Sequence, residues 1–268
     1  MITLAELYVY PVKSCRGVAV DEAVLLEAGF DHDREWMIVT PEGRFLTQRE
    51  IPRLALVVPT LGPDHLSLAA PGLPDLVVPH AVRGESREVV VWRDRCRAFD
   101  AGAAAADWLS RFLGRPVSLV RFDPSQPRYI DAEWAGDTRA ITRFSDGYAL
   151  LALSRASFDD LNSRLPAPLP MDRFRPNLVL EGLPPYGEDS LRDFQVAGMH
   201  LRGVKPCTRC AITTTRQSTG EVDGVEPLRT LKGYRWSKEL RGVMFGQNVI
   251  VVGAAGGRLA RGMPVALA

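Results

Sequence analysis

The amino-acid sequence predicts a β-rich α+β fold with a few short helices. Short runs of alternating or β-branched residues, such as Leu66–Ala69 and Glu88–Trp92, recur between turns that contain proline and glycine. This pattern is typical of β-barrels and sandwiches rather than of βαβ units. Helical spacing occurs at Ala103–Leu113 and at Arg155–Leu165. A chain of 268 residues is long enough for two modest domains.

Strands in the first half are predicted where β-branched and aromatic residues gather. They are Ile2–Tyr10, Ala23–Leu26, Met37–Thr40, Arg44–Arg49, Leu54–Val58, Leu66–Ala69, Leu76–Val78, Glu88–Trp92 and Val117–Phe122. Pro41-Glu42-Gly43 is the predicted hairpin turn between the third and fourth of these strands. The helix Ala103–Leu113 is expected to stop at Gly114, because glycine adopts the left-handed backbone that follows many helices.

The domain boundary is predicted in the polar stretch that begins at residue 123, so the domains span residues 1–122 and 123–268. Ser154 is the expected N-cap of the helix Arg155–Leu165, which three prolines end. Strands of the second half are predicted at Ala149–Leu153, Leu178–Leu180, Thr213–Arg216, Val249–Val252 and Val265–Leu267.

Composition excludes several classes of protein. The formal net charge of +1 indicates neither a nucleic-acid partner nor an acidic membrane surface. No run approaches the roughly 18 apolar residues of a membrane span, and the first 12 residues lack the pattern of a signal peptide. The four cysteines are too few for a disulfide framework, so we expect a protein of the reducing cytoplasm.

Two cysteines, Cys207 and Cys210, lie among the cationic residues Lys205, Arg209 and Arg216. Neighbouring cations favour the thiolate, which is the nucleophilic and metal-binding form of cysteine. Four chemistries are open to this pair: a structural zinc site, a redox dithiol, inert packing, or a thiolate ligand for a cofactor metal. Zinc lacks the second pair of ligands that it requires. A redox dithiol should open a helix, whereas a strand is predicted to follow here. Inert packing conflicts with the adjacent charges, so a cofactor metal is the remaining interpretation.

Other segments offer cations for an anionic ligand. Lys13 and Ser14 lie in a turn closed by Gly17, which is either an anion cradle or a solvated turn. Arg34 lies between Asp33 and Glu35 in the sequence. It forms either a structural ion pair with them or a phosphate-binding group that they orient.

A second group of cations surrounds Phe174, which lies just before the predicted strand Leu178–Leu180. If this segment is extended, Arg173, Arg175 and Asn177 project to one face and form a cationic row. A solvated sheet edge is the alternative.

The chain resembles MOSC-domain proteins. The segments that carry this resemblance in the second half are Cys207–Thr214, Glu226–Leu228, Tyr234–Arg235 and Phe245–Asn248. Those in the first half, Tyr10–Gly17, Asp33–Trp36 and Thr47–Arg49, resemble the β-barrel domain that precedes MOSC. Together the segments are similar to the mitochondrial amidoxime-reducing component and its bacterial relatives. The resemblance implies a β-barrel-like domain at residues 1–122 and a MOSC β-barrel domain at residues 123–268.

The resemblance also implies a molybdenum cofactor, in which a molybdopterin and one protein cysteine ligate the metal. By position, Cys210 is the implied metal ligand and catalytic residue, and Cys207 is a neighbour. The implied cofactor-binding residues are Lys13, Ser14, Arg34, Ser145, Asp146, Gly147, Tyr148, Arg175, Asn177, Thr208, Arg209 and Asn248.

Two functions follow from the resemblance. The first is a molybdenum-dependent oxidoreductase that reduces N-hydroxylated or N-oxygenated compounds such as amidoximes and hydroxylamines. It would take electrons from a separate ferredoxin, flavodoxin-like or cytochrome-type protein, because the chain has no cysteine cluster for an iron–sulfur centre. The second is a carrier or maturation protein that hands the cofactor on. No pyridoxal-phosphate desulfurase domain is present, which disfavours the second function.

Overall fold

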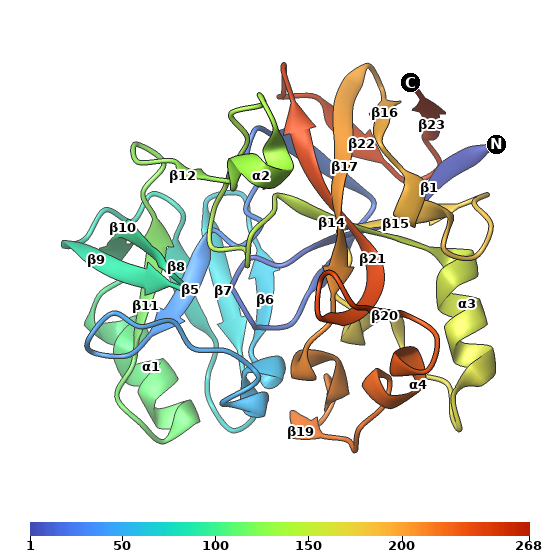
Figure 1. The fold of residues 1–268 in the computed structure, drawn as a ribbon. Helices are drawn as coiled ribbons and strands as arrows, with labels where there is room; N and C mark the ends of the chain where they lie inside the picture. Colours follow the sequence, from blue (N-terminus) through green and yellow to red (C-terminus); the bar gives the residue numbers. More distant parts are fainter.

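The computed structural model describes residues 1–268, and its centre is a closed barrel of seven strands. Around the barrel, the strands follow one another in the order β14 (Leu150–Ser154), β15 (Leu178–Glu181), β1 (Ile2–Val9), β23 (Pro264–Leu267), β16 (Asp193–Val196), β17 (Met199–Thr208) and β21 (Gly242–Val252). The ring closes because β21 also pairs with β14. Figure 1 shows the N-terminal strand β1 among strands from the other end of the chain.

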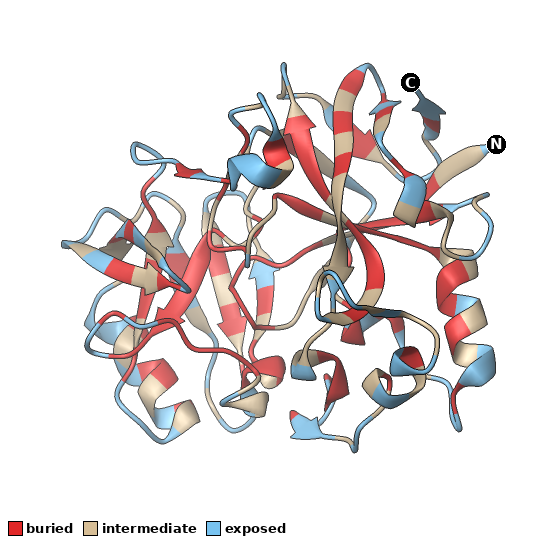
Figure 2. Ribbon diagram, in the orientation of Figure 1, coloured by how far each residue is buried: buried red, intermediate tan, exposed pale blue.

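Buried and less buried residues alternate along the strands of the barrel, so that one face of each strand packs on the core. Met199–Gly203 of β17 follows this period of two, as expected for a strand with one face on a core. Leu4, Leu7, Phe194, Leu201 and Val249 belong to a cluster of 19 buried apolar residues inside this part of the molecule. Figure 2 shows the buried positions concentrated along the strands.

Two further antiparallel sheets lie in the first half of the chain. One has the order β5 (Trp36–Val39), β11 (Ser118–Phe122), β10 (Asp94–Asp100) and β9 (Ser86–Val91). The other contains β6 (Val58–Leu61), β7 (His65–Ala69) and β8 (Leu76–Pro79). Trp36, Leu66 and Trp108 join a buried cluster of 17 residues that unites these sheets with helix α1 (Ala103–Leu113).

Short strands and helices complete the fold. The remaining strands are β2 (Val18–Val20), β3 (Glu22–Leu26), β4 (Gly29–Phe30), β12 (Arg128–Tyr129), β13 (Ile141–Thr142), β18 (Thr215–Arg216), β19 (Glu221–Val222), β20 (Trp236–Ser237) and β22 (Arg258–Ala260). The remaining helices are α2 (Ala132–Ala135), α3 (Arg155–Arg164) and α4 (Leu228–Lys232), with 3-10 turns η1 (Pro52–Leu56), η2 (Met171–Arg173), η3 (Gly187–Ser190) and η4 (Ala211–Thr214).

The structure confirms the β-rich fold class and both predicted helices. Helix α1 has the predicted bounds, and Gly114 follows it in the left-handed region at φ 68°. The Ser154 side chain accepts a hydrogen bond from the backbone N–H of Ser157, so the predicted N-cap is confirmed. Strands β10, β16 and β17 and several of the shorter strands were not predicted from the sequence.

Three predicted strands are wrong. Residues 44–49 make isolated bridges at Arg44 and Phe45 and then turn. Pro52 begins the 3-10 turn η1 where the strand Leu54–Val58 was expected, since proline is well suited to the first position of a helix. Ala211–Thr214 forms the 3-10 turn η4, so only Thr215 and Arg216 of the predicted strand Thr213–Arg216 are extended.

The pairing of the first strand bears on domain organisation. Strand β1 pairs with β15 and β23, so residues 2–9 belong to the same barrel as residues 264–267. The division into residues 1–122 and 123–268 stays a prediction. No helix in the structure is long and apolar enough to cross a membrane.

Candidate functional site

A cleft of about 540 Å³ is lined by residues from both halves of the chain. All thirteen residues predicted for the site line it. These are Lys13, Ser14, Arg34, Ser145, Asp146, Gly147, Tyr148, Arg175, Asn177, Thr208, Arg209, Cys210 and Asn248. The structure therefore brings the predicted residues together, and their individual roles stay predictions.

Lys13 lies in the turn after β1, and only 4% of its side chain is exposed. Its ammonium group donates a hydrogen bond to the carbonyl of Phe144 at 2.7 Å and forms an ion pair with Asp146. Burial lowers the pKa of Lys13 from its ordinary value, and Asp146 opposes that effect. Burial alone would raise the pKa of Asp146, but the adjacent Lys13 holds it well below its usual range. Each group therefore favours the charged form of the other.

The loop Ser145–Tyr148 is held by a buried guanidinium group. Arg128 donates hydrogen bonds to the carbonyl oxygens of Ser145 at 2.5 Å and Asp146 at 3.2 Å. The hydroxyl of Thr142 donates to the carbonyl of Tyr148 at 3.3 Å. These contacts hold the backbone of the loop against the cleft while the Asp146 side chain remains 55% exposed.

Arg34 and Arg175 both pack against the ring of Tyr10. Their guanidinium carbons lie 4.2 Å and 4.3 Å from the ring centroid, within the range of cation–π contacts. The Tyr10 hydroxyl donates to the carbonyl of Pro176 at 2.9 Å, which anchors the ring. A side chain at Gly17 would collide with this ring. Tyr10 thus supports two cations of the cleft, and this role was not predicted from the sequence.

Asn177 is fully buried and links three segments. Its side-chain oxygen accepts from Arg34 at 2.9 Å and from the backbone N–H of Leu151 at 3.2 Å. Its side-chain nitrogen donates to the carbonyl of Tyr8 at 3.0 Å and to Asp33 at 3.1 Å. Asn177 therefore holds the guanidinium group of Arg34 as well as the strands around it.

The predicted cationic row Arg173–Arg175–Asn177 is wrong. Residues Met171–Arg173 form a 3-10 turn and Arg175 has a left-handed φ of 57°, so the segment is not extended. Arg173 is instead buried away from the cleft, where it donates to the carbonyl of Thr214 at 3.1 Å and pairs with Asp223 at 2.6 Å. Arg175 and Asn177 line the cleft, and Arg173 does not.

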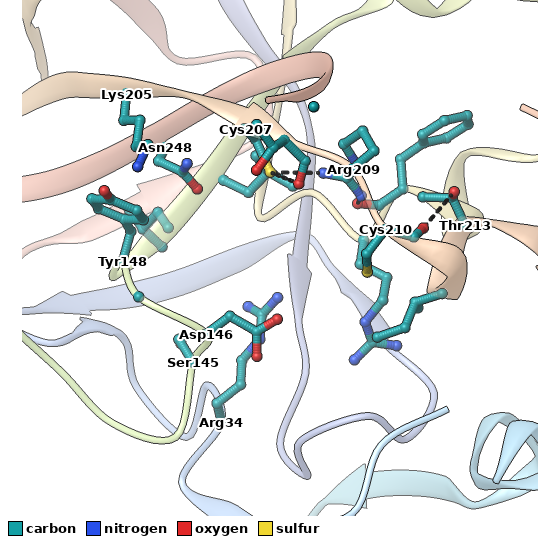
Figure 3. A pocket seen from close by; sticks show the side chains of 18 of the residues that line it. Arg34, Ser145, Asp146, Tyr148, Lys205, Cys207, Arg209, Cys210, Thr213 and Asn248 are labelled. Carbon is teal, nitrogen blue, oxygen red and sulfur yellow. Dashed lines mark hydrogen bonds between the residues drawn. The ribbon is translucent and has the colours of Figure 1, made fainter. Parts of the chain in front are cut away.

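The two thiols differ in their surroundings. The sulfur of Cys207, on β17, accepts a hydrogen bond from Arg209 at 3.1 Å. Cys210 follows the strand as the residue before η4, and its carbonyl accepts from the Thr213 hydroxyl at 2.9 Å. Figure 3 shows these bonds, with Cys210 apart from the group formed by Tyr148, Lys205 and Asn248. Both thiols line the cleft.

Strand β17 reaches the cleft through two irregular steps in its pairing with β21. The register shifts between Gly203 and Lys205 and again between Pro206 and Thr208. Bulges of this kind redirect side chains and are common beside active sites. Asn248 of β21 pairs with Lys205, which places both residues on the same wall.

Backbone strain gathers at the cleft. Eight residues other than glycine have positive φ, and five of them line the cleft: Ser14, Arg34, Trp92, Arg175 and Arg241. Such conformations cost about 1–3 kcal/mol each and cluster at functional sites. This concentration of strain is a further reason to treat the cleft as the candidate functional site.

The cleft is strongly cationic. Its lining includes one carboxylate, Asp146, and seven cations: Lys13, Arg34, Arg49, Arg175, Lys205, Arg209 and Arg241. Lys13 and Arg34 have carboxylate partners, and the other five have none. Buried nitrogens of Arg49 and Arg209 also lack a hydrogen-bond partner. An anionic ligand with several acceptor atoms would satisfy these groups.

The prediction did not include several of the residues that line the cleft, among them Arg49, Trp92 and Arg241. Arg49 follows Gln48, which is fully buried and donates to the carbonyl of Ser14 at 2.7 Å. Its place in the segment Thr47–Arg49, which carried part of the resemblance, was the available signal. Trp92 and Arg241 carried no signal in the sequence, because the positive φ of each becomes visible only in the structure.

The residues of the cleft fit a phosphate-bearing metal cofactor. Its cations and unpaired donors suit an anion, its volume suits a cofactor, and Cys210 offers a soft sulfur ligand. A structural zinc site would need further ligands beside the two cysteines. The cleft lining contains no histidine and only one carboxylate.

Comparison with family models matches both halves of the chain. Residues 1–116 match the MOSC N-terminal beta barrel domain, and residues 140–265 match the MOSC domain.

Curated relatives match along nearly the whole chain. The human mitochondrial amidoxime-reducing component 1 is 36% identical over 260 residues, covering 92% of this chain and 76% of the relative. The mouse protein of the same name is 35% identical, covering 91% of this chain and 75% of the relative. The bovine mitochondrial amidoxime reducing component 2 is 34% identical, covering 87% and 72%.

Proposed function

Because this chain belongs to the family of the mitochondrial amidoxime-reducing components, with an MOSC N-terminal and an MOSC domain, we propose that it is a molybdenum-cofactor-dependent reductase. Its substrates would be N-hydroxylated compounds such as amidoximes and hydroxylamines. Family membership supports a function related to the molybdenum cofactor. The cationic cleft with Cys210 in its wall is the observation that carries the proposal to this chain.

The cofactor, when bound, supplies oxygen-atom and electron transfer. The residues of this chain hold and orient it. Cys210 is the proposed metal ligand, and Lys13, Ser14, Arg34 and Arg175 are proposed to bind the phosphate and pterin. Ser145, Gly147, Tyr148, Asn177, Thr208 and Asn248 complete the proposed binding walls. Arg209 is proposed to offset negative charge near the metal, since it has no carboxylate partner and already donates to the neighbouring Cys207 sulfur.

The overall reaction consumes two electrons and two protons for each N–OH group that becomes N–H and water. We propose that a separate ferredoxin, flavodoxin-like or cytochrome-type protein supplies the electrons. The cytoplasmic location expected from cysteine usage stays a prediction, while the names of the relatives describe those proteins as mitochondrial.

Turnover of an N-hydroxylated amidine tests the proposed function. Protein loaded with cofactor is expected to contain close to one molybdenum per chain and to reduce benzamidoxime with reduced methyl viologen as the electron source. Ligand-free protein is the control and should be inactive. Full molybdenum loading without turnover of any N-hydroxy compound would contradict the reductase. Rapid transfer of the cofactor to an apo-molybdoenzyme, without turnover, would instead identify a carrier.

Substitution of Tyr10 tests the support beneath Arg34 and Arg175. Tyr10→Leu removes the ring that both guanidinium groups contact, so we expect roughly tenfold weaker cofactor retention. Tyr10→Phe keeps the ring and loses the hydrogen bond to Pro176, at a stability cost of about 1 kcal/mol. The rate of molybdenum loss during dialysis measures retention, and thermal melting measures stability. Equal retention in the two variants would show that the ring does not position the arginines.

A further inference from the structure

A cationic segment leads into strand β21. Between Glu226 and Arg241 a cation recurs at every third position, at Arg229, Lys232, Arg235, Lys238 and Arg241. The segment contains five cations and two carboxylates, which give it a net charge of +3, whereas the formal net charge of the whole chain is +1. Positive charge is therefore concentrated here, although the chain as a whole is nearly neutral.

Three of these cations are free to meet a partner. Lys232, Lys238 and Arg241 are exposed and take part in no ion pair, whereas the other two cations each pair with a carboxylate. Trp236 lies among them in the sequence, and 48% of its surface is exposed. The Lys232 ammonium lies 5.8 Å from the Trp236 ring centroid. Tryptophan is enriched among the residues that supply most of the binding energy of protein interfaces, so an exposed Trp236 beside free cations indicates a docking surface.

The fold holds this segment in one place. Figure 1 shows α4, β20 and β21 beside one another. The backbone N–H of Arg235 donates to the carbonyl of Leu231 at 2.7 Å, and its own carbonyl accepts from the N–H of Met244 at 2.9 Å. Helix α4 is thus joined to β21 through the residue that precedes β20. The exposed side chains on this hairpin and on the end of α4 form one surface, which we call the hairpin patch: Lys232, Trp236, Lys238 and Arg241.

The hairpin patch adjoins the part of the cleft that contains Cys210. Arg241 and Cys210 both line the cleft. Trp236 pairs with Val243, and the carbonyl of Val243 accepts a hydrogen bond from the backbone N–H of Arg209 at 2.8 Å. Arg209 is the residue before Cys210. Two strand spacings, about 10 Å, therefore separate the backbone of Trp236 from the neighbour of the proposed metal ligand.

We propose that the hairpin patch is the docking surface for the electron donor, and that this donor is a soluble redox protein with an acidic face. The inference rests on the proposed reductase, in which each N–OH group takes up two electrons and two protons to give N–H and water while the donor is oxidised. A one-electron carrier docks twice in each turnover, so its contact has to form and break quickly. Unpaired cations suit this task, because complementary charge raises the association rate more than the affinity, and electron-transfer contacts are small.

Carbodiimide cross-linking maps the surface, because the reagent joins lysines to carboxylates and the chain has only four lysines. The probes are three acidic carriers: a [2Fe–2S] ferredoxin, a flavodoxin and a small cytochrome. Lys13 is 4% exposed and Lys205 lies on β17, so products at Lys232 or Lys238 identify the hairpin patch. We expect products there with at least one carrier. Products confined to Lys205, or none with any carrier, would refute the proposal.

Reduction of benzamidoxime by cofactor-loaded protein gives a second test. The double variant Lys232→Glu/Lys238→Glu is expected to lower kcat/KM for the reduced carrier about tenfold at low salt and less at high salt. Trp236→Ala should also lower it about tenfold. Both should retain turnover with reduced methyl viologen, a small molecule that needs no protein interface. Arg111→Glu is the matched control, because Arg111 is an exposed and unpaired cation on α1, away from α4 in Figure 1. Its kcat/KM should not change.

Unchanged kcat/KM for the carrier in the hairpin variants, or an equal loss in Arg111→Glu, would contradict the docking surface. So would turnover with methyl viologen but with none of the three carriers. Unaltered protein that is inactive with every donor refutes the reductase instead, and the cross-links, which need no turnover, then decide the docking surface alone. An anionic membrane is the other surface that a tryptophan and lysines fit. Binding to phosphatidylserine vesicles that both hairpin variants lose, with unchanged carrier kinetics, would replace the protein partner with a membrane.

Discussion

Replacing Cys210 with serine is expected to remove molybdenum from the protein and to abolish reduction of N-hydroxylated compounds. A serine hydroxyl remains protonated at neutral pH and is a poor replacement for a thiolate as a soft metal ligand. We expect molybdenum content to fall at least about tenfold and turnover more than about 100-fold, because loss even of supporting groups around a metal costs 10–100-fold. Metal analysis of the purified protein and turnover of benzamidoxime with reduced methyl viologen measure the two effects.

Cys207→Ser is the matched control for this experiment. Cys207 also lines the cleft, but its sulfur is already engaged by Arg209 at 3.1 Å. The control should retain molybdenum and turnover close to those of the unaltered protein. Thermal melting should be similar for both variants, because Thr213 holds the backbone of Cys210 rather than its sulfur. Unchanged molybdenum binding in Cys210→Ser, or a greater loss in Cys207→Ser, would overturn the ligand assignment.

Asn177→Leu is expected to cause the largest loss of stability among single substitutions in the cleft wall. The change keeps the approximate volume of the side chain but deletes four hydrogen bonds. It deprives the N–H of Leu151 and the carbonyl of Tyr8 of their Asn177 partners, while Asp33 keeps its hydrogen bond from the N–H of Tyr10. At about 1–3 kcal/mol for each unsatisfied group, the free energy of unfolding should fall by about 3–5 kcal/mol. The melting temperature should fall on the order of 10 °C.

Asn162→Leu provides the comparison for Asn177→Leu. The Asn162 side chain also makes two hydrogen bonds, to the N–H and carbonyl of Leu169 at 2.9 Å and 3.1 Å. It is less buried, so water can replace these bonds, and the expected cost is about 1 kcal/mol. Chemical denaturation of both variants gives the two free energies. Equal costs would show that the network around Asn177 contributes no more than a local loop contact.

Local physics made part of the fold predictable. The helix Ala103–Leu113 and its Gly114 stop, and the Ser154 cap, depend on residues close in the sequence. The predicted strand Thr213–Arg216 failed for a different reason. The hydroxyls of Thr213 and Thr214 donate to carbonyls three residues earlier, which stabilises a turn over the strand that β-branched residues favour.

Residues of the candidate site were predictable where they lie in a short sequence motif. They were not predictable where their position depends on contacts with residues far away in the sequence. Cys210 and Lys13 lie in short motifs, so their positions followed from the sequence. Tyr10 was counted as part of a strand, because nothing in the chain shows that Arg34 and Arg175 converge on its ring. Arg173 failed as a cleft residue for the complementary reason: its partner Asp223 lies 50 residues away.

The pairing of β1 with β23 has a consequence for how the molecule is made. Ile2 lies opposite Val265, so β1 is synthesised long before the strand β23 with which it pairs. Contacts so distant in sequence slow folding and leave strand edges exposed in the meantime. The binding cleft cannot be complete on a nascent chain, since Cys210 and Asn248 also come late. Capture of the proposed cofactor in this cleft would therefore follow the synthesis of β21, and the edge of β1 that pairs with β23 stays open until β23 is made.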